Sequence, residues 1–419
     1  MKTVDSATIS NDWYIAPLEY VFMFSLLLTV NSVYWVSTDP LYRRLILSLI
    51  FGTGLVLSAY SLKKIRFLQT KIIWMLLVYY LIIVPLLLYN RSLGYAGIDD
   101  FIRMIFFPII IVFYIDYSTI KQNNNILRKI VNVGVFLSII SLLFWMLKIF
   151  GMNYNSSIQM YWGKLQEVNG LFRLQFFPQG SVNFLGFSIL RNSGIYSEAP
   201  MFSYVLASCL IINLFLETDS KMNNYKTIIL IITLITTTST TGLLIIIISL
   251  LLKFYLRVPN LGKILVLLVI PIVIYIVEFV MASKMESMGG SVNIRFDDIH
   301  AGFEAWKQNP LVGNGLDNSY SIKIFMDQAR LGLYGNDGYS SGLMSMLARG
   351  GIILAMLLFF VPTINFSKKS VYNFFFSVCF SAMFLVSTVD RTYFFVFIIL
   401  WMYNTSANWK QGNYLPIKK

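Results

Sequence analysis

The sequence is poor in the residues on which many soluble enzymes and secreted proteins depend. It has 419 residues but only one histidine, His300, and two cysteines, Cys209 and Cys379. A single histidine excludes a histidine-rich metal cluster, and we expect no disulfide framework because both cysteines fall within long apolar runs. Charged residues make up only 13% of the chain, against about 25% in soluble domains. These scarcities argue against an ordinary soluble fold.

What the sequence does contain is apolar length. Hydrophobic residues make up 57% of the chain, and several runs approach or exceed the roughly 20 residues that span a bilayer. These runs do not alternate as the strands of membrane barrels do. We therefore predict an all-α polytopic membrane protein, with residues 1–419 forming a single integral membrane domain. About twelve spans are expected, near residues 15–36, 45–62, 72–90, 101–116, 130–150, 199–216, 226–238, 241–257, 263–282, 344–365, 372–387 and 392–405.

Two neighbouring spans, 226–238 and 241–257, could instead be one long helix. The segment from Thr236 to Gly242 reads TTTSTTG, which indicates a tight polar break between two helices. Threonine runs within spans are typical of helix packing and of side-chain bonds to the preceding turn. We therefore interpret this run as structural.

The net charge of +13 is explained by where the cations fall. One set of predicted loops (61–71, 117–129, 217–226, 253–263, 366–371 and 406–419) holds 17 Lys and Arg but only Glu217 and Asp219. The short loops on the other side hold four residues of each sign. The positive-inside rule then places both termini in the cytoplasm, and two long loops, 151–198 and 283–343, fall outside. No nucleic-acid partner is needed to explain the charge.

The first external loop ends in a group of polar residues directly before a span. Arg191, Gly194, Glu198 and Pro200 lie within ten residues of one another. Glu198 could be a helix-terminus carboxylate, because proline and acidic residues favour helix starts, and Arg191 could extend to lipid headgroups. Aromatic residues precede this group, which suits an interfacial hairpin, a re-entrant element or a platform for sugar rings.

The second external loop predicts an amphipathic helix over about 294–308. Phe296, Ile299, Phe303 and Trp306 recur at helical spacing, so we expect this stripe to pack on the bundle or in the membrane interface. Arg295 and Asp298 are three residues apart and could form a solvated pair of little value. After the helix, the glycines of the turn 310–315 could let backbone N–H groups approach a ligand.

Two further arginines, Arg103 and Arg349, lie just inside predicted spans near the outer surface. Arginines within membranes are costly and mark functional sites by default. We predict that Arg103, Arg191, Arg295 and Arg349 meet at one depth, where their guanidinium groups could bind diphosphate oxygens in bidentate fashion.

The chain resembles the O-antigen polymerase (Wzy) and O-antigen ligase superfamily of bacterial polysaccharide assembly. Three features carry the resemblance: Arg191-x-x-Gly194 with Glu198 and Pro200, the break Ser239-Thr240-Thr241-Gly242, and the late external loop. That loop supplies Arg295, Trp306, Pro310, Gly313 and Gly315. The resemblance implies a GT-C-like membrane glycosyltransferase that uses undecaprenyl-diphosphate-linked oligosaccharides outside the bacterial inner membrane. It also implies membrane lipids, and a chain-length regulator, as candidate partners.

One departure from the family pattern favours polymerase over ligase. Ligases of this superfamily tend to carry a His-Asn pair late in the large loop, where this chain reads Gly335-Asn336-Asp337-Gly338, and His300 lies too early to replace it. A flippase for lipid-linked oligosaccharides is an alternative of another class, but it should concentrate its cations in a central cavity.

The physical demands of glycosyl transfer assign provisional roles to these residues. Departure of a diphosphate builds negative charge that fixed cations stabilise. We expect Arg191 and Arg295 to bind it, with Arg103 or Arg349 assisting, and Glu198 or Asp337 to accept the proton from the incoming hydroxyl. We expect Tyr161, Trp162 and Tyr196 to contact sugars. Neither a metal nor another cofactor is expected, because no nucleotide motif or metal-carboxylate cluster is evident.

Overall fold

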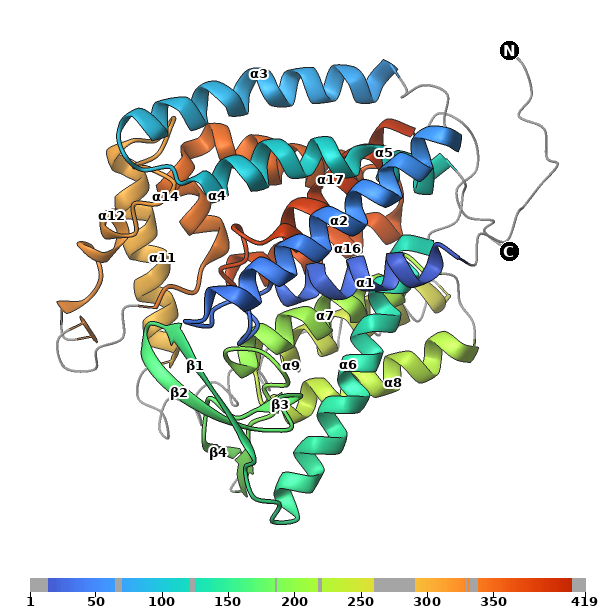
Figure 1. Ribbon diagram of the computed structural model, residues 1–419, viewed down its shortest axis with the longest axis vertical. Coiled ribbons are helices and arrows are strands. Elements are labelled where there is room, and N and C mark those ends of the chain that lie inside the picture. Colours follow the sequence, from blue (N-terminus) through green and yellow to red (C-terminus); the bar gives the residue numbers. More distant parts are fainter. Residues whose placement is uncertain are drawn as a thin grey trace.

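The computed structural model describes residues 14–64, 70–120, 125–184, 187–217, 221–259, 291–328, 330–331 and 338–408. Helices predominate in these residues, as predicted, and most of them run side by side in one bundle (Figure 1). The first half contains α1 (Ala16–Leu28), α2 (Pro40–Lys64), α3 (Thr70–Ser92), α4 (Ile98–Phe101), the π-helical turn η1 (Ile102–Phe106), α5 (Phe107–Ile120) and α6 (Asn125–Ile149). The second half contains α7 (Ala199–Phe215), α8 (Lys221–Thr236), α9 (Thr240–Arg257), α11 (Ser291–Gln308), α12 (Tyr320–Lys323), α14 (Gly342–Ala355), η2 (Met356–Phe360), α15 (Val361–Ser367), α16 (Val371–Leu385) and α17 (Tyr393–Asn408).

Several helices are suited to a membrane by length and composition. Among the described residues, five can cross a bilayer: Pro40–Lys64, Ile72–Ser92, Ile126–Ile149, Thr240–Arg257 and the continuous stretch Gly342–Ser367. Four shorter apolar helices accompany them, at Ala16–Leu28, Ala199–Phe215, Val371–Leu385 and Tyr393–Ser406. These helices fit a polytopic membrane protein. The expected span 263–282 lies outside the described residues.

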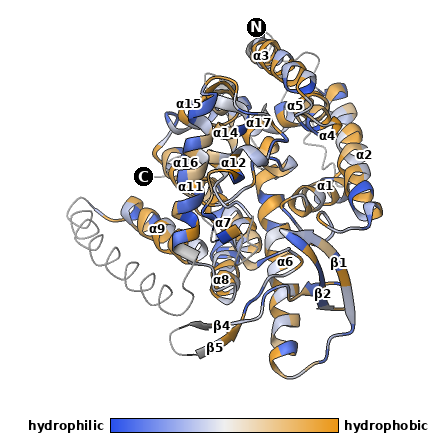
Figure 2. Ribbon diagram, turned by 90° about the vertical axis from the view of Figure 1, so that its left-hand side faces the viewer, coloured by the Kyte–Doolittle hydropathy of each residue, from blue (hydrophilic) through white to orange (hydrophobic). Residues whose placement is uncertain are grey.

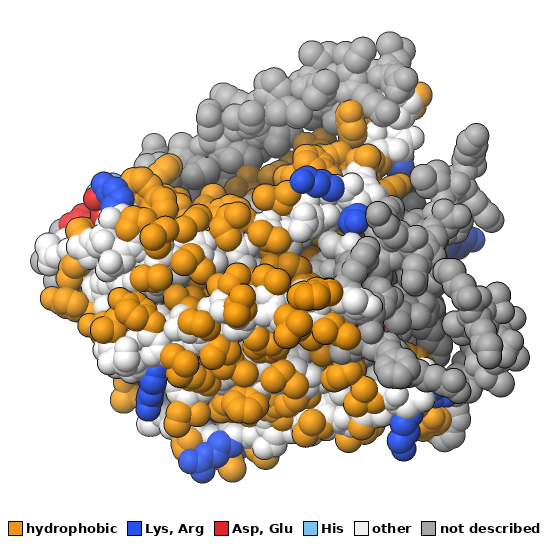
Figure 3. All heavy atoms as spheres, turned by 90° about the horizontal axis from the view of Figure 1, so that it is seen from above, with side chains coloured by type: hydrophobic (Ala, Val, Ile, Leu, Met, Phe, Trp, Pro, Cys, Tyr) orange, Lys and Arg blue, Asp and Glu red, His pale blue; other side chains and the backbone are white. Residues whose placement is uncertain are grey.

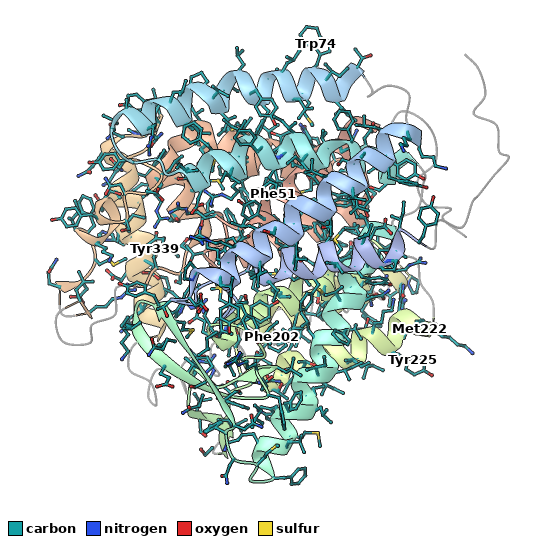
Figure 4. The ribbon with its side chains drawn as sticks, in the orientation of Figure 1. Phe51, Trp74, Phe202, Met222, Tyr225 and Tyr339 are labelled. Atoms are coloured by element: carbon teal, nitrogen blue, oxygen red, sulfur yellow. The ribbon has the colours of Figure 1, made fainter. Side chains whose placement is uncertain are left out.

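The outer surface of the bundle is apolar where it would meet lipid. On α3, Trp74, Leu77 and Leu81 are 64%, 55% and 77% exposed, and Trp74 points away from the bundle in Figure 4. Seen from the α3 side, the surface is a broad hydrophobic face with its Lys and Arg side chains mostly towards the margins (Figure 3). The interior is equally apolar and includes both cysteines, which are buried and free.

The first long loop is not helical, which corrects the all-α expectation for this segment. It forms the sheet β1 (Ser156–Trp162), β2 (Lys164–Leu171) and β3 (Gln175–Phe176), and the hairpin β4 (Ser181–Phe184) with β5 (Phe187–Leu190). Gly163, with φ +69°, makes the turn between β1 and β2. Met160 and Val168 point inward from facing strands and pack on Val33.

The segment after α1 also departs from expectation. The predicted span 15–36 ends as a helix at Leu28, and Asn31 adopts φ +52°. The following residues pair with the first long loop instead, through bridges from Ser32 to Tyr196 and from Ser37 to Met160. The apolar character of 30–36 therefore reflects burial against the loop rather than a longer helix.

The amphipathic helix predicted for the second long loop is present as α11, which crosses the end of the bundle where the β1–β2 hairpin also lies (Figure 1). Part of its apolar stripe faces outward, since Phe296 and Phe303 are 68% and 42% exposed, whereas Trp306 packs against the core of the bundle. In Figure 2, α11 mixes hydrophilic and hydrophobic colouring, whereas α3 and α9 are largely hydrophobic. The side packed on the protein carries small residues, Ala301 and Ala305, which are fully buried.

The sequence predicts that the glycine turn 310–315 after α11 could offer its N–H groups to a ligand. In the structure, these N–H groups bond to protein backbone instead. The N–H groups of Asn314 and Gly315 donate to the carbonyl oxygens of Ala348 (2.9 Å) and Arg349 (3.0 Å) on α14. The α14 helix is kinked at Gly351, which has φ +67°, and the turn satisfies the carbonyls there. Such pairing is what allows irregular backbone within an apolar bundle.

This contact predicts a strong cost for a side chain at the kink. In Gly351→Ala the new Cβ would collide with the backbone of Leu311 and Gly313, and the positive φ alone costs about 1–3 kcal/mol. We expect a lower thermal unfolding midpoint in detergent. Gly52→Ala on α2 is the matched control, because its Cβ would meet no atom within 4 Å. Equal midpoints for the two variants would contradict the packing described here.

Candidate functional site

The loop between β5 and α7 is held in place by one buried side chain. Asn192 is fully buried, and its amide oxygen accepts hydrogen bonds from Ser141 Oγ (2.6 Å), Gln175 Nε2 (3.0 Å) and Gly194 N (3.2 Å). Its amide nitrogen donates to Thr236 Oγ1 at 3.0 Å, and its backbone N–H donates to Thr236 O at 3.1 Å. Asn192 thereby connects α6, β3 and the end of α8 to the loop that carries Arg191.

The polar break between α8 and α9 fixes two of the predicted arginines. Arg191 Nε donates to the carbonyl oxygen of Thr237 at 3.3 Å, and an Arg295 guanidinium nitrogen donates to Thr241 Oγ1 at 3.0 Å. The break exists because Thr236 and Thr237 bond back to the preceding turn and Ser239 caps α9. The predicted packing role of this run is present, but the sequence interpretation missed its contacts with the arginines.

Glu198 occupies the N-cap position of α7 but does not cap the helix. Its backbone is extended (φ −161°, ψ 158°) and its side chain makes no capping hydrogen bond. Instead, Gln179 Oε1 accepts from the N–H of Ala199 at 3.0 Å. The Glu198 carboxyl is turned to the Trp162 indole, with which it hydrogen-bonds, and lies within electrostatic reach of Arg191 and Arg295. Glu198 therefore lies at the helix terminus, as one interpretation of the sequence expected, but its carboxyl does not cap the helix.

The electrostatics of this group are those of charges partly withdrawn from water. Burial raises the pKa of Glu198, and Trp162, Arg191 and Arg295 oppose that rise. Burial likewise lowers the pKa of Arg191 and of Arg295, and the Glu198 charge counteracts it in both. Guanidinium groups stay charged under such shifts, so the site pairs two cations with one carboxyl that is easier to protonate than usual.

The other two predicted arginines do not join this group, which corrects the expectation that all four meet. Arg103 and Arg349 line a separate cavity together with Arg391, Asp100 and Asp390. Arg103 forms an ion pair with Asp100 and donates to the carbonyl oxygen of Arg391 at 3.0 Å. The position of an arginine along a predicted span indicates its depth in the membrane but not the direction in which its side chain points. The sequence therefore could not separate Arg103 and Arg349 from Arg191 and Arg295.

Arg391 itself was missed by the sequence interpretation. It pairs with Asp100 at 3.2 Å and also with Asp317. The available signal was the Asp390-Arg391 pair, which separates the two apolar runs 371–387 and 392–403.

The expected sugar-contacting aromatics divide into exposed and buried residues. Tyr161 is 62% exposed at the tip of the β1–β2 hairpin, and Trp162 lies beside it against Glu198. Tyr196 is fully buried, its ring stacked on Phe202 at 5.4 Å, and Phe202 lies inside the bundle in Figure 4. Tyr196 is therefore a packing residue with no surface for a sugar. Asp337 lies outside the described residues.

Comparison with known proteins supports the resemblance found from the sequence. A family model described as O-antigen ligase matches residues 227–360, which is about a third of the chain. The matched stretch includes Thr237, Thr241, Arg295 and Arg349, whereas Glu198 precedes it. No curated protein matches the chain significantly.

The Asn192 network predicts a measurable loss of stability on truncation. Asn192→Ala would leave Ser141 and Gln175 without this acceptor in the interior, and each buried group left unsatisfied costs about 1–3 kcal/mol. We expect a clear drop in the unfolding midpoint in detergent. Asn132→Ala is the control, because Asn132 makes one exposed hydrogen bond, to Tyr20. A midpoint for Asn192→Ala as high as that of the control would refute the role given to this network.

Proposed function

We propose, with the family match as the premise, that this protein is a membrane glycosyltransferase of polysaccharide assembly. It transfers a glycan from undecaprenyl diphosphate at the outer side of the bacterial inner membrane. The observation that carries the proposal is that Arg191 and Arg295 are both anchored at the break between α8 and α9, within electrostatic reach of the half-buried Glu198. These are two residues suited to a diphosphate and one suited to a hydroxyl proton.

The two arginines would act on the leaving group. As the glycosyl–diphosphate bond breaks, positive charge grows on the sugar and negative charge on the diphosphate oxygens. Arg191 and Arg295 are held by neutral oxygens, those of Thr237 and Thr241, so their charge remains for the ligand. Cations that bind the departing diphosphate more tightly than the intact donor lower the barrier selectively.

Glu198 would act on the acceptor. The acceptor hydroxyl oxygen forms a bond to the anomeric carbon, the bond from that carbon to the diphosphate oxygen breaks, and its electron pair leaves with the diphosphate. The hydroxyl proton passes to the Glu198 carboxylate. Trp162 fixes the orientation of this carboxyl, and the exposed Tyr161 offers an aromatic face to the sugars.

We favour a polymerase, in which a growing lipid-linked chain is the donor and one lipid-linked repeat unit is the acceptor. The support is the sequence Gly335-Asn336-Asp337-Gly338 where ligases of the superfamily tend to carry His-Asn. A ligase is the second candidate, favoured by the description of the matching family. A flippase would be favoured by the cavity lined by Arg103, Arg349 and Arg391. It is less well supported because Arg191 and Arg295 lie outside that cavity, at the break between α8 and α9.

The first test is elongation by the purified protein given only a synthetic undecaprenyl-diphosphate-linked repeat unit. We expect a ladder of longer lipid-linked products. Arg191→Ala and Arg295→Ala should each lower the rate by about 10²–10³, the usual cost of removing one stabilising donor. Arg44→Ala, at an exposed arginine of α2, is the matched control. Transfer only to a different added acceptor would favour a ligase. Full activity of Arg191→Ala and Arg295→Ala would refute the proposed diphosphate site.

The second test is the dependence of the rate on pH. A base must be deprotonated, so activity should fall as pH drops through the Glu198 pKa. Because burial raises that pKa, the acid limb should lie above the value of about 4.3 for an ordinary glutamate. Glu198→Gln should lower the rate by about 10²–10⁴ and flatten this limb. An unchanged limb in Glu198→Gln would assign the proton acceptor to another group.

A further inference from the structure

Helical spacing places a carboxylate next to one of the proposed ligand-binding arginines. Arg295 and Asp298 are three residues apart on α11, a spacing at which side chains lie on the same side of a helix. Asp298 is fully buried, and its charge acts on Arg295. A direct pair between these two residues is the arrangement that the sequence alone suggests.

In the structure, the Asp298 carboxylate bonds to Arg330 and Ser340 rather than to Arg295. A guanidinium nitrogen of Arg330 lies 2.7 Å from Asp298 Oδ1, and the backbone N–H of Ser340 donates to Asp298 Oδ2 at 2.9 Å. The Ser340 hydroxyl donates to the same oxygen. Tyr339, whose hydroxyl donates to the Asp298 carbonyl at 2.6 Å, lies against α11 (Figure 4). Both carboxylate oxygens thus have partners other than Arg295.

The pairing of Asp298 with Arg330 affects the net positive charge available to a ligand near Glu198. Arg191, Arg295 and Glu198 together carry one net positive charge when Glu198 is ionised. If Asp298 paired with Arg295, that charge would be cancelled and one guanidinium group would be occupied. Because Arg295 instead bonds to the neutral Thr241 hydroxyl, its charge stays available to an anion.

We propose that Arg330 is a positioning residue of the transfer site. By holding the Asp298 carboxylate, it keeps the Arg295 guanidinium free to bind the diphosphate of the lipid-linked substrate. This inference rests on the function proposed above. It assigns to Arg330, which is 35 residues from Arg295 in sequence and need not touch the substrate, control over the affinity of the site.

The test is binding of undecaprenyl diphosphate, without a sugar, to the full-length protein in lipid nanodiscs. Arg330→Ala should weaken binding about tenfold or more, because Asp298 is then released beside Arg295. Adding Asp298→Asn to Arg330→Ala should restore affinity to within about threefold of the wild type. Arg330→Lys, which can keep the ion pair, should bind nearly as the wild type does.

Asp297 supplies the matched control for this rescue. It is the other partner of Arg330, at 2.9 Å, but it is two residues from Arg295 on α11, a spacing at which side chains do not face each other. Adding Asp297→Asn to Arg330→Ala should therefore leave binding weak. If Arg330→Ala does not fold, Arg330→Met replaces it, since methionine keeps much of the side-chain volume but cannot donate to Asp298.

The possible outcomes separate this inference from the function on which it rests. Failure of the wild type to bind undecaprenyl diphosphate, or equal binding by Arg295→Ala, would overturn the proposed function. Loss of binding in Arg295→Ala, with wild-type binding in Arg330→Ala, would overturn only the role of Arg330. So would a loss in Arg330→Ala that Asp298→Asn does not relieve, since that result indicates a general loss of structure.

Discussion

The site depends on guanidinium groups being anchored by neutral oxygen atoms in an apolar bundle. A charge removed from water must be paired or well hydrogen-bonded, and a carboxylate partner would neutralise it. Arg191 and Arg295 are held by a threonine carbonyl and a threonine hydroxyl. These neutral acceptors orient the guanidinium groups without neutralising their charge. The carboxyl that lies near both, Glu198, is itself held by Trp162. Orientation and charge are thus provided by different residues.

Interrupted helices make this anchoring possible. The break between α8 and α9 exposes the carbonyl of Thr237 and places Thr241 in the first turn of a new helix. The kink of α14 at Gly351 is likewise satisfied by the turn after α11, and that turn fixes the end of the helix that carries Arg295. In both places one of the two long loops completes the hydrogen bonds that an apolar helix has given up. The long loops are therefore structural parts of the bundle.

Much of this arrangement could be predicted from sequence, and the failures have physical reasons. The order and sidedness of the polar motifs predicted that Arg191, Glu198 and Arg295 would lie together. Depth along a span does not fix direction, so Arg103 and Arg349 were wrongly added to that group. The α11 stripe was identified, but the side that packs on protein uses Ala301 and Ala305, whose small size permits close approach. Periodic large apolar residues reveal a helix in the sequence, but small residues such as Ala301 and Ala305 can form the face that packs on the protein.

Other details depend on partners distant in the chain. Tyr196 was expected to contact sugars, but Phe202 and the segment after α1 enclose it. The threonine break contacts Arg295 from 54 residues away, and no local pattern contains that contact. The first long loop forms its own strands, and a hairpin was among the alternatives expected for it, but its bridges to Ser32 and Ser37 join residues far apart in the chain.

One amide has a consequence for how this site could change. Gln179 supplies the oxygen that the start of α7 requires, a task for which the adjacent Glu198 is equally well placed by sequence. If position 179 lost its acceptor, the glutamate could turn to the exposed N–H groups of the helix. The helix would then be well capped, and the carboxyl would be withdrawn from the two arginines. A glutamine earlier in the same long loop thus leaves the Glu198 carboxyl free of the capping that its own helix requires.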